Sequence, residues 1–558
     1  MKYKWVLPKN KSQGLFNQII ESRNISKLQL NKFITPNFFN DQSDPRIISG
    51  LKKSIGRIKK ALDSQENIGL FCDYDADGIP AGAMLFKAFS KFNQNLSVYI
   101  PTRQEGYGIS DKSLNFFLDK KCSLVIAVDV GITAKILAEK FKHQKVDLII
   151  IDHHLIIEDL YPTSALAVID LKNKNEKYMF KDFSAGGLVW KLLYALHLEY
   201  QIFSEPEIKW FLDLACISTI SDIVPLVDEN WLISKYGLIV LSKTKNIGLK
   251  KLIDISSIDP EKIDEYSVGF QIGPRLNASG RMANPIDSFN LLIENDRKVA
   301  KELAEKLDKN NRLRQMQMED VFLEAQAKIE KLSIDKHKII IVKSIHWQEG
   351  ILGLVASKIV DKYYLPAIVF KEKKGELVGS VRSIRGFDIE QALEKNKENI
   401  ESFGGHKMAA GLRVKIDKYY KFKQEMIRFA SANIDKKILT KKIIIDAKTD
   451  DCNEINLKQY NLIEKMRPFG EENRQPIVML ENVEITDTRE VGKEKNHLSF
   501  LIGDKLRAIY FNYPKNGRIK SREKYDICGN IILNTWGEHK KIEFRVIDLR
   551  QGGEAVST

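Results

Sequence analysis

Three aspartates stand at alternate positions in the stretch LFCDYDADGIP, which covers Leu70–Pro80. Asp73, Asp75 and Asp77 follow an apolar run and directly precede Gly78. Carboxylates this close repel one another and resist leaving water, so a folded protein offsets them with cations or leaves them exposed. A bound metal ion is therefore the first chemistry that this spacing suggests.

The flanking sequence argues against a calcium loop of the EF-hand type. Such a loop also begins with alternating aspartates and has glycine at its sixth position, but its twelfth position, a bidentate glutamate, is Met84 here. The pattern predicts a buried strand over Asn67–Phe71 and a helix over Ala81–Phe92. A strand, an acidic loop and a helix in that order are typical of an α/β enzyme.

Further candidate ligands follow other apolar runs of the same region. Asp129 comes after SLVIAV, and Asp152, His153 and His154 come after VDLIII. Asp222, in STISDIVPL, follows an apolar segment that we expect to be helical. In doubly wound sheets, ligands gather beyond the carboxyl ends of the strands. Carboxylate and imidazole donors suit Mn²⁺ or Mg²⁺, and histidine favours Mn²⁺.

The spacing of the acidic residues is suited to two metal ions. Alternate residues of an extended segment point the same way and lie roughly 6.6–7 Å apart, so Asp75 and Asp77 could each hold one of two ions ~3.5–4 Å apart. Asp129 could then bridge them. Two such ions stabilise the attacking and the leaving oxygen in phosphodiester hydrolysis. The sequence thus predicts a hydrolytic two-metal site.

Each of these pieces has an ordinary structural explanation when it stands alone. Aspartates after a strand often form a turn or cap a helix, and Asp222 alone would be a cap. A pair of histidines is more often a surface or core feature than a pair of ligands. The four elements fall together at matching strand ends of one fold, and this joint occurrence favours the metal site.

The bulk properties describe a large, basic, globular protein. With 558 residues and 43% hydrophobic content, we expect about three or four domains. No apolar run approaches the length of a membrane span, and the start MKYKWVLPKN does not resemble a signal peptide, so we expect a cytoplasmic protein. The five scattered cysteines form no CxxC pair. The net charge of +14 favours an acidic partner such as nucleic acid.

Short apolar runs alternate with amphipathic stretches from about Ser49 to Leu226, which predicts a parallel sheet with helices on both faces. A stretch of about 37 residues from DRKVAKEL to AKIEKL contains neither glycine nor proline and predicts one long helix. Its middle, KNNRLRQ, is polar nearly all round, as is typical of a solvent-bridging helix between domains.

A second α/β segment follows over 338–414, with strands HKIIIVK and LPAIVF and with Gly-rich segments, GSVRS and FGGHKMAAG, that we interpret as turns. Beyond Asp435, five or six predicted strands in about 110 residues suggest a small barrel, of which the OB-fold is one common type.

Four of these motifs, DYDADG, VDVGI, IDHH and SDIVP, resemble the phosphoesterase motifs of the DHH family. The later segments IPTRQEGYGIS, GPRLNASGR, GILGLVASKI, GSVRSI and FGGHKMAAGL are similar to those of the family's single-strand-specific exonucleases. The resemblance runs from about Asp44 to Arg550, and so ordered a set is highly specific.

The resemblance implies roles for particular residues. The implied metal ligands are Asp75, Asp77, Asp129, His153 and Asp222. Supporting groups around them are Asp73, Asp152 and His154, of which we also count His154 as catalytic. The implied phosphate-binding set is Arg103, Arg275, Ser380, Arg382 and His406. Arginine forks and the backbone N–H groups of Gly-rich segments both suit phosphate oxygens.

We expect an α/β fold: a DHH-type parallel sheet domain joined by a long helix to a second α/β domain of the DHHA1 type, plus a carboxyl-terminal all-β barrel of the OB type. The expected boundaries are 1–45 for an N-terminal segment, 46–230 for the catalytic domain, 231–290 for a connecting region, 291–333 for the long helix, 334–434 for the substrate-binding domain and 435–558 for the barrel.

The resemblance implies 5′-to-3′ degradation of single-stranded DNA to 5′-mononucleotides with two Mn²⁺ or Mg²⁺ ions, in recombination and repair. We expect a monomer that acts on single-stranded DNA and not at a membrane, with a helicase or a single-strand-binding protein as candidate partners. Two alternatives remain: a phosphodiesterase for short oligonucleotides or cyclic dinucleotides, which would need neither long helix nor barrel, and a non-catalytic replication scaffold, which would not need the intact ligand set.

Overall fold

The computed structural model describes residues 3–9, 12–514, 519–535 and 540–552. Contact clustering separates two compact units. One contains Phe38–Ile438 together with Gly470–Glu472, and the other contains Met1–Asn37, Leu439–Phe469 and Asn473–Thr558. Within the described residues, every helix is too short or too polar to cross a bilayer.

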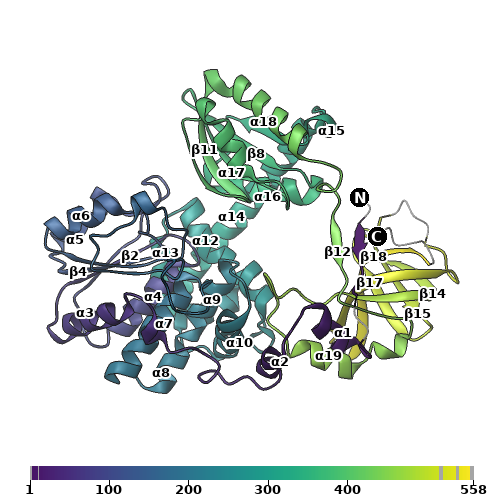
Figure 1. Ribbon diagram of the computed structural model, residues 1–558, viewed down its shortest axis with the longest axis horizontal. Helices are drawn as coiled ribbons and strands as arrows, with labels where there is room; N and C mark the ends of the chain where they lie inside the picture. Colours follow the sequence, from purple (N-terminus) through teal and green to yellow (C-terminus); the bar gives the residue numbers. More distant parts are fainter. Residues whose placement is uncertain (1–2, 10–11, 515–518, 536–539, 553–558) are drawn as a thin grey trace. The chain divides into compact units, whose positions relative to one another are not determined.

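The larger unit begins with a parallel sheet of five strands, ordered β3-β2-β4-β5-β6, as the sequence predicts (Figure 1). The strands are β2 (Ile68–Cys72), β3 (Leu96–Tyr99), β4 (Leu124–Val128), β5 (Asp147–Ile151) and β6 (Ala167–Ile169). Figure 1 shows α5 (Asp111–Asp119) and α6 (Lys135–His143) on one face, and α3 (Leu51–Asp63), α4 (Gly78–Phe89) and α7 (Ala185–Tyr200) on the other. Strands β2 and β4 are buried throughout, as expected of a sheet covered on both faces.

The strand order reverses between β2 and β4. The chain first adds β3 on one side of β2, then returns to add β4, β5 and β6 on the other side. In open α/β sheets, such a switch point leaves a crevice beyond the carboxyl ends of the two strands, and ligands bind there. Asp73 directly follows β2 and Asp129 directly follows β4, so the first two acidic segments of the sequence open onto this point.

Helix α4 begins three residues earlier than the expected Ala81, at Gly78. The Asp75 carboxylate causes this, because it accepts hydrogen bonds from the backbone N–H groups of Asp77 and Gly78 (2.8 and 3.1 Å) and so satisfies the first turn. A Cβ on Gly78 would lie 2.7 Å from the Asp73 carbonyl oxygen, so only glycine allows the loop to fold this tightly.

A helical region follows the first sheet and ends in the long helix α14 (Arg297–Ile329). The preceding helices are α8 (Glu205–Trp210), α9 (Leu212–Ser221), α10 (Asp228–Ser242), α11 (Ile247–Ile255), α12 (Gly273–Met282) and α13 (Ile286–Ile293).

One face of the polar middle of α14 is buried, whereas Lys309, Arg312 and Gln315 are exposed, so the expectation of a helix that is solvent-exposed nearly all round is wrong for that one face. Asp308, Asn311 and Arg314 are all less than 10% exposed, and Asp308 accepts a hydrogen bond from Arg275 of α12 at 3.0 Å. Polar residues can be buried where another segment supplies their partners, and the sequence of one helix does not reveal that partner.

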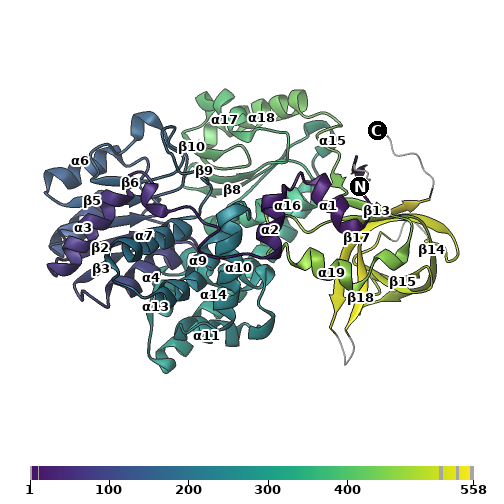
Figure 2. The same ribbon diagram turned by 60° about the horizontal axis from the view of Figure 1, so that its bottom comes forward.

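The second α/β region is a mixed sheet ordered β10-β11-β9-β8-β7, in which only β7 and β8 are parallel. Its strands are β7 (Ile340–Ser344), β8 (Ala367–Lys373), β9 (Glu376–Arg382), β10 (Ser402–His406) and β11 (Ala409–Lys415). Figure 2 shows α17 (Ile389–Lys395) and α18 (Tyr419–Asn433) on one side of this sheet and α16 (Leu352–Tyr363) on the other.

The glycines of the Gly-rich segments of this sheet lie in strands, so our interpretation as turns is wrong for GSVRS and holds in FGGHKMAAG only for the hairpin turn at Lys407 and Met408. GSVR lies in β9, and FGGH and AAG lie in β10 and β11. The glycines make room for neighbours: a Cβ on Gly379 would lie 2.5 Å from the Phe370 ring, which packs on Phe422 of α18. Glycine in a strand often marks such a close approach.

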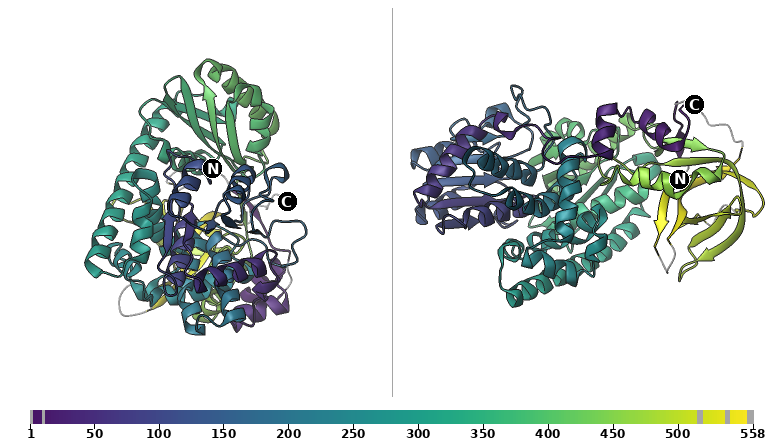
Figure 3. Two further views of the ribbon diagram at one scale, coloured as in Figure 1. Left: turned by 90° about the vertical axis from the view of Figure 1, so that its left-hand side faces the viewer. Right: turned by 90° about the horizontal axis from the view of Figure 1, so that it is seen from below.

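The smaller unit is a closed barrel. Strands β14 (Val478–Val491), β15 (His497–Ile502), β16 (Leu506–Tyr510), β18 (Lys541–Gln551) and β17 (Lys524–Asn534) pair in that order, and β17 returns to β14. The strands, yellow in the right panel of Figure 3, curve around one apolar core. Strand β13 (Ala447–Thr449) extends the sheet beside β14.

The N-terminal segment packs with this barrel. Leu15, Phe16 and Ile19 of α1 (Leu15–Ser22) are buried in the barrel core. Strand β1 (Lys4–Val6) pairs with β12 (Lys442–Ile444), which is therefore not a barrel strand. The remaining helices of the unit are α2 (Lys27–Ile34) and α19 (Leu457–Glu464).

Candidate metal centre and phosphate site

The predicted metal ligands converge beyond the carboxyl ends of β2, β4 and β5. His153 lies at the centre, because its Nε2 atom is 3.3 Å from Asp77 Oδ2, 3.3 Å from Asp129 Oδ1 and 3.6 Å from Asp222 Oδ2. Asp222 comes from the C-cap of α9. Four segments that are far apart in the sequence therefore meet around one imidazole.

The donor atoms form three overlapping groups, and within each group all donors lie within 4.8 Å of one another. One group is Asp77, His153 and Asp222, a second is Asp129, His153 and His154, and the third is Asp73, Asp75 and Asp129. Asp129 and His153 each belong to two groups, as expected of residues between two metal positions. The structure also brings Asp73 among the donors, where the sequence suggests a supporting group.

These carboxylates carry more negative charge than their surroundings compensate. Burial, followed by repulsion from the other carboxylates, raises the pKa of Asp129 and of Asp222 well above the ordinary value. The Asp73 and Asp129 Oδ1 atoms are buried and have no hydrogen-bond partner among the described residues. Orphaned buried acceptors in a like-charged cluster fit divalent cations. Burial also lowers the pKa of His153, which favours the neutral imidazole that metals bind.

Asp77 is held by groups that the sequence pattern does not reveal. Its carboxylate accepts hydrogen bonds from the N–H groups of Ala185 (2.9 Å) and Gly186 (3.0 Å), at the N-terminus of α7, and from the Ser218 hydroxyl. A helix N-terminus favours a negative charge through its free N–H groups and its dipole. These contacts fix the orientation of Asp77 toward His153. The Ser184 cap before SAGG is the one sequence signal of this helix start.

His154 and Asp152 form a pair beside the donors. His154 Nδ1 lies 2.7 Å from Asp152 Oδ1. Burial disfavours the charged imidazole, but the hydrogen bond to Asp152 and the surrounding carboxylates outweigh it and raise the pKa of His154 to about 9. Asp152 also accepts the backbone N–H groups of Ile132 and His153. At neutral pH, His154 is therefore a proton-bearing group next to the site.

Backbone strain accompanies the site. Asp129 has a φ of 65°, and Ile223, directly after Asp222, has a φ of 59°. The left-handed region is unfavourable for a β-branched residue and costs about 1–3 kcal/mol when the surroundings impose it. Tyr107 donates a hydrogen bond from its hydroxyl to the Asp129 carbonyl oxygen (3.1 Å), which helps to hold this conformation.

A cluster of guanidinium groups lies next to the acidic loop. Arg103 stacks over the Tyr74 ring, and its Nε donates to the Gly280 carbonyl oxygen (3.1 Å). Arg281 donates to the Gly350 carbonyl oxygen (3.0 Å). Burial and the nearby Arg103, Arg314 and Arg382 lower the pKa of Arg281 to about 10, while Asp75 opposes this. Arg281 is the last residue of the GPRLNASGR motif, and the sequence analysis did not select it.

Arg275 takes a different position from the rest of the predicted phosphate-binding set. Its guanidinium pairs with Asp308 of α14 at 3.0 Å and donates to the Gln271 carbonyl oxygen at 2.8 Å. In this structure its contacts connect α12 to α14, and they do not leave the guanidinium facing the carboxylates.

Ser380, Arg382 and His406 share one face of the second sheet. Arg382 pairs with Ala409 across β9 and β11, and Ala409 pairs with His406 across β11 and β10. Directly opposed residues point to the same face, so Arg382 and His406 flank the small side chain of Ala409. Ser380 lies on that face two residues before Arg382.

The N-terminus of α16 faces this same row. A Cβ on Gly353 would lie 3.0 Å from Arg382 Nη2 and 3.6 Å from Ser380 Oγ. A guanidinium, a hydroxyl and the N-terminus of a helix therefore meet at one place, which is a favourable arrangement for a phosphate.

Comparison with family models finds three matches in order along the chain: the DHH family N-terminal domain over 67–219, the DHHA1 domain over 336–432 and the RecJ OB domain over 445–548. The chain therefore contains an N-terminal domain of the DHH family followed by a DHHA1 domain. The DHH match contains the metal-ligand cluster except Asp222, which lies just beyond it, and the DHHA1 match contains Ser380, Arg382 and His406.

Among curated proteins, the chain is similar to the single-stranded-DNA-specific exonuclease RecJ of Bacillus subtilis (34% identity over 517 residues). The match covers 91% of this chain and 64% of that relative, so this chain spans less than two thirds of its length. The RecJ of Haemophilus influenzae is 29% identical, with 84% of this chain and 85% of the relative covered.

Among solved structures, RecJ of Thermus thermophilus in complex with Mn²⁺ superimposes with a TM-score of 0.81 at 23% identity, covering 99% of this chain and 80% of that chain. An exonuclease RecJ bound to manganese matches with a TM-score of 0.60 at 27% identity, covering 70% of this chain and 96% of that one. The expected arrangement of a DHH sheet domain, a DHHA1 domain and an OB-type barrel is confirmed.

Proposed function

We propose that this protein is a metal-dependent exonuclease that degrades single-stranded DNA from 5′ to 3′ and releases 5′-mononucleotides, in recombination and repair. The observation that carries the proposal is the set of three donor groups linked by Asp129 and His153, beside the guanidinium cluster of Arg103, Arg281 and Arg382. Carboxylates that hold cations, next to arginines that hold phosphate, suit phosphodiester hydrolysis.

We assign the metal-holding role to Asp75, Asp77, Asp129, His153 and Asp222, with Mn²⁺ or Mg²⁺ as the cofactor, and we add Asp73 as a further donor. Two bound ions would make a water acidic enough to ionise near neutrality and would stabilise charge on the phosphate. The names of two solved relatives, RecJ in complex with Mn²⁺ and with Mg²⁺, support this choice of metal.

The other residues of the site orient the metal ligands or bind the phosphate groups of the substrate. The helix α7 N-terminus and Ser218 keep Asp77 aimed at the site. His154, held by Asp152, keeps a proton at neutral pH, and we assign to it a contact with a phosphate oxygen or delivery of a proton to the leaving oxygen. Ser380, Arg382 and His406 grip a phosphate of the strand.

The substrate follows from the relatives and from the barrel. The curated relatives are named single-stranded-DNA-specific exonucleases, and barrels of the OB type bind single strands through stacking and a basic groove. The polarity is what the family resemblance implies. We further propose a monomer in the cytoplasm, with a helicase or a single-strand-binding protein as candidate partners.

The test is the hydrolysis of a single-stranded DNA oligomer labelled at one end. With Mn²⁺, a 5′ label should appear at once as a mononucleotide, whereas a 3′ label should remain in progressively shorter strands. A matched duplex and a matched RNA should be degraded far more slowly. Early release of the 3′ label would overturn the polarity, and equal hydrolysis of the duplex would overturn the strand preference.

A truncation tests the proposed role of the barrel. Because α1 contributes Leu15, Phe16 and Ile19 to the barrel core, the cut must remove residues 1–37 together with the barrel and leave 38–438. The truncated protein should bind long single strands more weakly and still cleave very short ones. Equal losses of cleavage on long and short strands would show that the barrel contributes to the catalytic step and not only to binding of the strand.

The same assays separate the alternatives. A phosphodiesterase for short oligonucleotides or cyclic dinucleotides would hydrolyse dinucleotides faster than long strands, with or without the barrel. A replication scaffold would bind DNA and release no nucleotide with either metal.

A further inference from the structure

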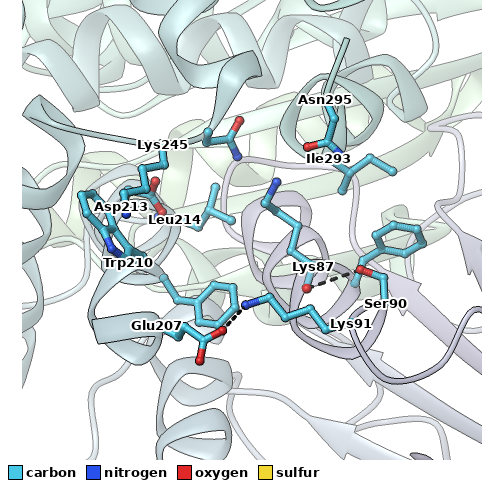
Figure 4. A pocket seen from close by; sticks show the side chains of 13 residues that line it. Lys87, Ser90, Lys91, Glu207, Trp210, Asp213, Leu214, Lys245, Ile293 and Asn295 are labelled. Atoms are coloured by element: carbon cyan, nitrogen blue, oxygen red, sulfur yellow. Dashed lines mark hydrogen bonds and ion pairs between the residues drawn. The ribbon is translucent and has the colours of Figure 1, made fainter. Parts of the chain in front are cut away.

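A second site lies at the far side of the DHH domain, in a cavity of about 480 Å³ (Figure 4). The cavity is lined by the C-terminal ends of α4 and α13, by the junction between α8 and α9, and by the loop before α11. Lining residues that matter below are Lys87, Lys91, Lys245, Trp210, Asp213 and Asn295. Its volume falls within the range of about 300–1,000 Å³ that is usual for small-molecule sites.

The lysine ammonium groups are the distinctive feature of this cavity. Figure 4 shows the Lys87 ammonium pointing into the open space, and among the described residues it has no hydrogen bond or ion pair. Lys245 rests over the Trp210 ring, with its Nζ atom 4.3 Å from the ring centroid. Lys91 pairs with Glu207 at 2.7 Å at the rim. Two ammonium groups therefore face the cavity without a carboxylate partner.

The nearby carboxylate of Asp213 makes no direct ion pair with Lys87, although its charge partly opposes the lowering of the Lys87 pKa. Asp213 is buried and accepts hydrogen bonds from the Thr244 hydroxyl (2.5 Å) and from the Leu214 N–H (2.7 Å). Burial raises the pKa of Asp213 to about 6 and lowers the pKa of Lys87. An uncompensated, partly buried ammonium gains stability from a ligand that brings a negative charge.

The remaining walls are apolar or carry amides. Phe86, Leu214 and Ile293 supply an apolar surface, and Figure 4 shows the Asn295 side chain at the rim among them. A ligand that fits must combine an anionic group with a flat, partly apolar body that has hydrogen-bonding edges. We propose that this cavity binds a 5′-mononucleotide, with the phosphate on Lys87 and Lys245 and the base against Phe86, Leu214 and Asn295.

The position of the cavity couples it to the metal centre. Helix α4 starts directly after Asp77 and ends at the cavity with Phe86 and Lys87. Helix α9 starts at the cavity with Asp213 and ends at Asp222. At ~1.5 Å per residue, the helical rise from Asp77 to Lys87 places the cavity roughly 15 Å from the chemistry.

Asp77 and Asp222 belong to one donor group, so a shift of α4 against α9 would change their separation. We infer that nucleotide binding at the cavity alters metal affinity, and by reciprocity that the metal alters nucleotide affinity. This inference concerns binding and does not depend on the proposed exonuclease activity.

The test is equilibrium dialysis of the full chain, in EDTA, against dAMP, deoxyadenosine or inorganic phosphate. We expect one dAMP per chain, bound at least tenfold more tightly than deoxyadenosine or phosphate. Lys87→Met, which keeps the length and removes the charge, should weaken dAMP binding at least tenfold. Lys245→Ala, at an exposed loop position, should weaken it as well and guards against a folding defect in the first variant.

Two controls locate the nucleotide. Lys243→Met removes an exposed lysine of the same loop that does not line the cavity and should leave dAMP binding unchanged. The lysine variants are also compared in the Arg382→Ala background, in which dAMP held at the proposed phosphate site of the DHHA1 domain contributes least. Wild-type affinity in both Lys87→Met and Lys245→Ala, or loss in Arg382→Ala alone, would overturn the site. Equal affinity for phosphate and dAMP would overturn the nucleotide.

The coupling has its own readout. In the Arg382→Ala background, saturating dAMP should change the Mn²⁺ affinity at least twofold, and adding Lys87→Met should abolish that change. An identical change in both proteins would show that dAMP acts elsewhere and would overturn the coupling.

Discussion

The carboxyl edge of the DHH sheet and the face of the DHHA1 sheet next to the N-terminus of α16 both carry predicted site residues, but they are built in opposite ways. At the first, Asp129 is buried, crowded by other carboxylates and held at a φ of 65°. At the second, Arg382 and His406 flank Ala409 across three regular strands, and a Cβ on Gly404 would meet nothing within 4 Å.

This difference follows from what each region must hold. A small, doubly charged ion needs several negative donors at one point, and only the switch point of a parallel sheet gathers them from distant segments. A phosphate of a long polymer needs an open surface with directional donors, which one antiparallel meander can supply from neighbouring positions. The metal site is therefore expected to be strained and sensitive, and the phosphate face tolerant.

The largest effect should come from Asp129→Ala. This residue belongs to two of the three donor groups, so its loss should weaken both metal positions. Loss of a residue that only supports metal ligands costs up to about 100-fold in activity. Because Asp129 is itself a ligand, we expect the rate of hydrolysis to fall by more than that. Single-strand binding, measured with Ca²⁺ in place of the active metal, should change little. Substantial turnover by a folded, contaminant-free variant would contradict the two-metal assignment.

A smaller effect on the same region is expected of Ser218→Ala. The Ser218 hydroxyl donates to Asp77, and its loss should reduce Mn²⁺ affinity by about 10–100-fold, as is usual for partners of metal ligands. Ser221→Ala is the matched control: this hydroxyl lies on the same helix and has no hydrogen-bond partner among the described residues. Isothermal titration with Mn²⁺ distinguishes the two, and equal affinities would remove Ser218 from the site.

The two regions should also differ in their pH dependence. Asp129 and Asp222 have pKa values raised above the ordinary 3.8, so the metal-free fold binds extra protons and loses stability as pH rises from 3.8 through those raised values. Bound metal must displace the protons, so Mn²⁺ affinity should rise with pH from 3.8 through those raised values, by up to about tenfold per pH unit for each proton released.

DNA binding through Arg382 should stay nearly flat over the same range, because arginine remains protonated there. Titrations with Mn²⁺ in buffers of different ionisation heat would count the protons released. A flat Mn²⁺ affinity and no proton release would show that the carboxylates are already charged in the metal-free protein.

The sequence identifies the metal ligands better than it identifies the residues that hold those ligands in place. Asp129 and His153 are predictable because they lie one and two residues after buried strands, and parallel strands end at one edge. Ser218 is not, because a hydroxyl in an apolar helix, 141 residues from Asp77, has no local signal. Arg281 lies inside a recognisable motif, but whether it or Arg275 faces the site depends on how α12 packs against α14.

The two wrong expectations have a common cause. GSVRS looks like a turn because glycine usually marks one, yet Gly379 is needed to make room for the Phe370 ring. The middle of α14 looks solvent-exposed all round because it is polar, yet one face of it, with Asn311 and Arg314, is buried next to the pair that Asp308 forms with Arg275. In both cases the residue type is explained by a contact with a residue of another element. The local sequence pattern does not show that contact.

The smallest effect, and the sharpest test of the phosphate face, is expected of Arg382. Arg382→Ala should weaken binding of a single-stranded oligomer several-fold and reduce the slope of log affinity against log salt by about 0.7, the value for one phosphate contact on a single strand. Arg382→Lys should restore the slope but only part of the affinity, because an ammonium keeps the charge and loses the planar fork. Arg428→Ala, which removes an exposed arginine from α18 on the other face of the same sheet, is the control and should change neither quantity.

With Ca²⁺ present to suppress cleavage, an Arg382→Ala protein with wild-type affinity and slope would take this residue out of the DNA site. The row formed with Ala409 and His406 would then be a structural feature of the sheet, and phosphate binding would have to rest on Arg103 and Arg281 alone.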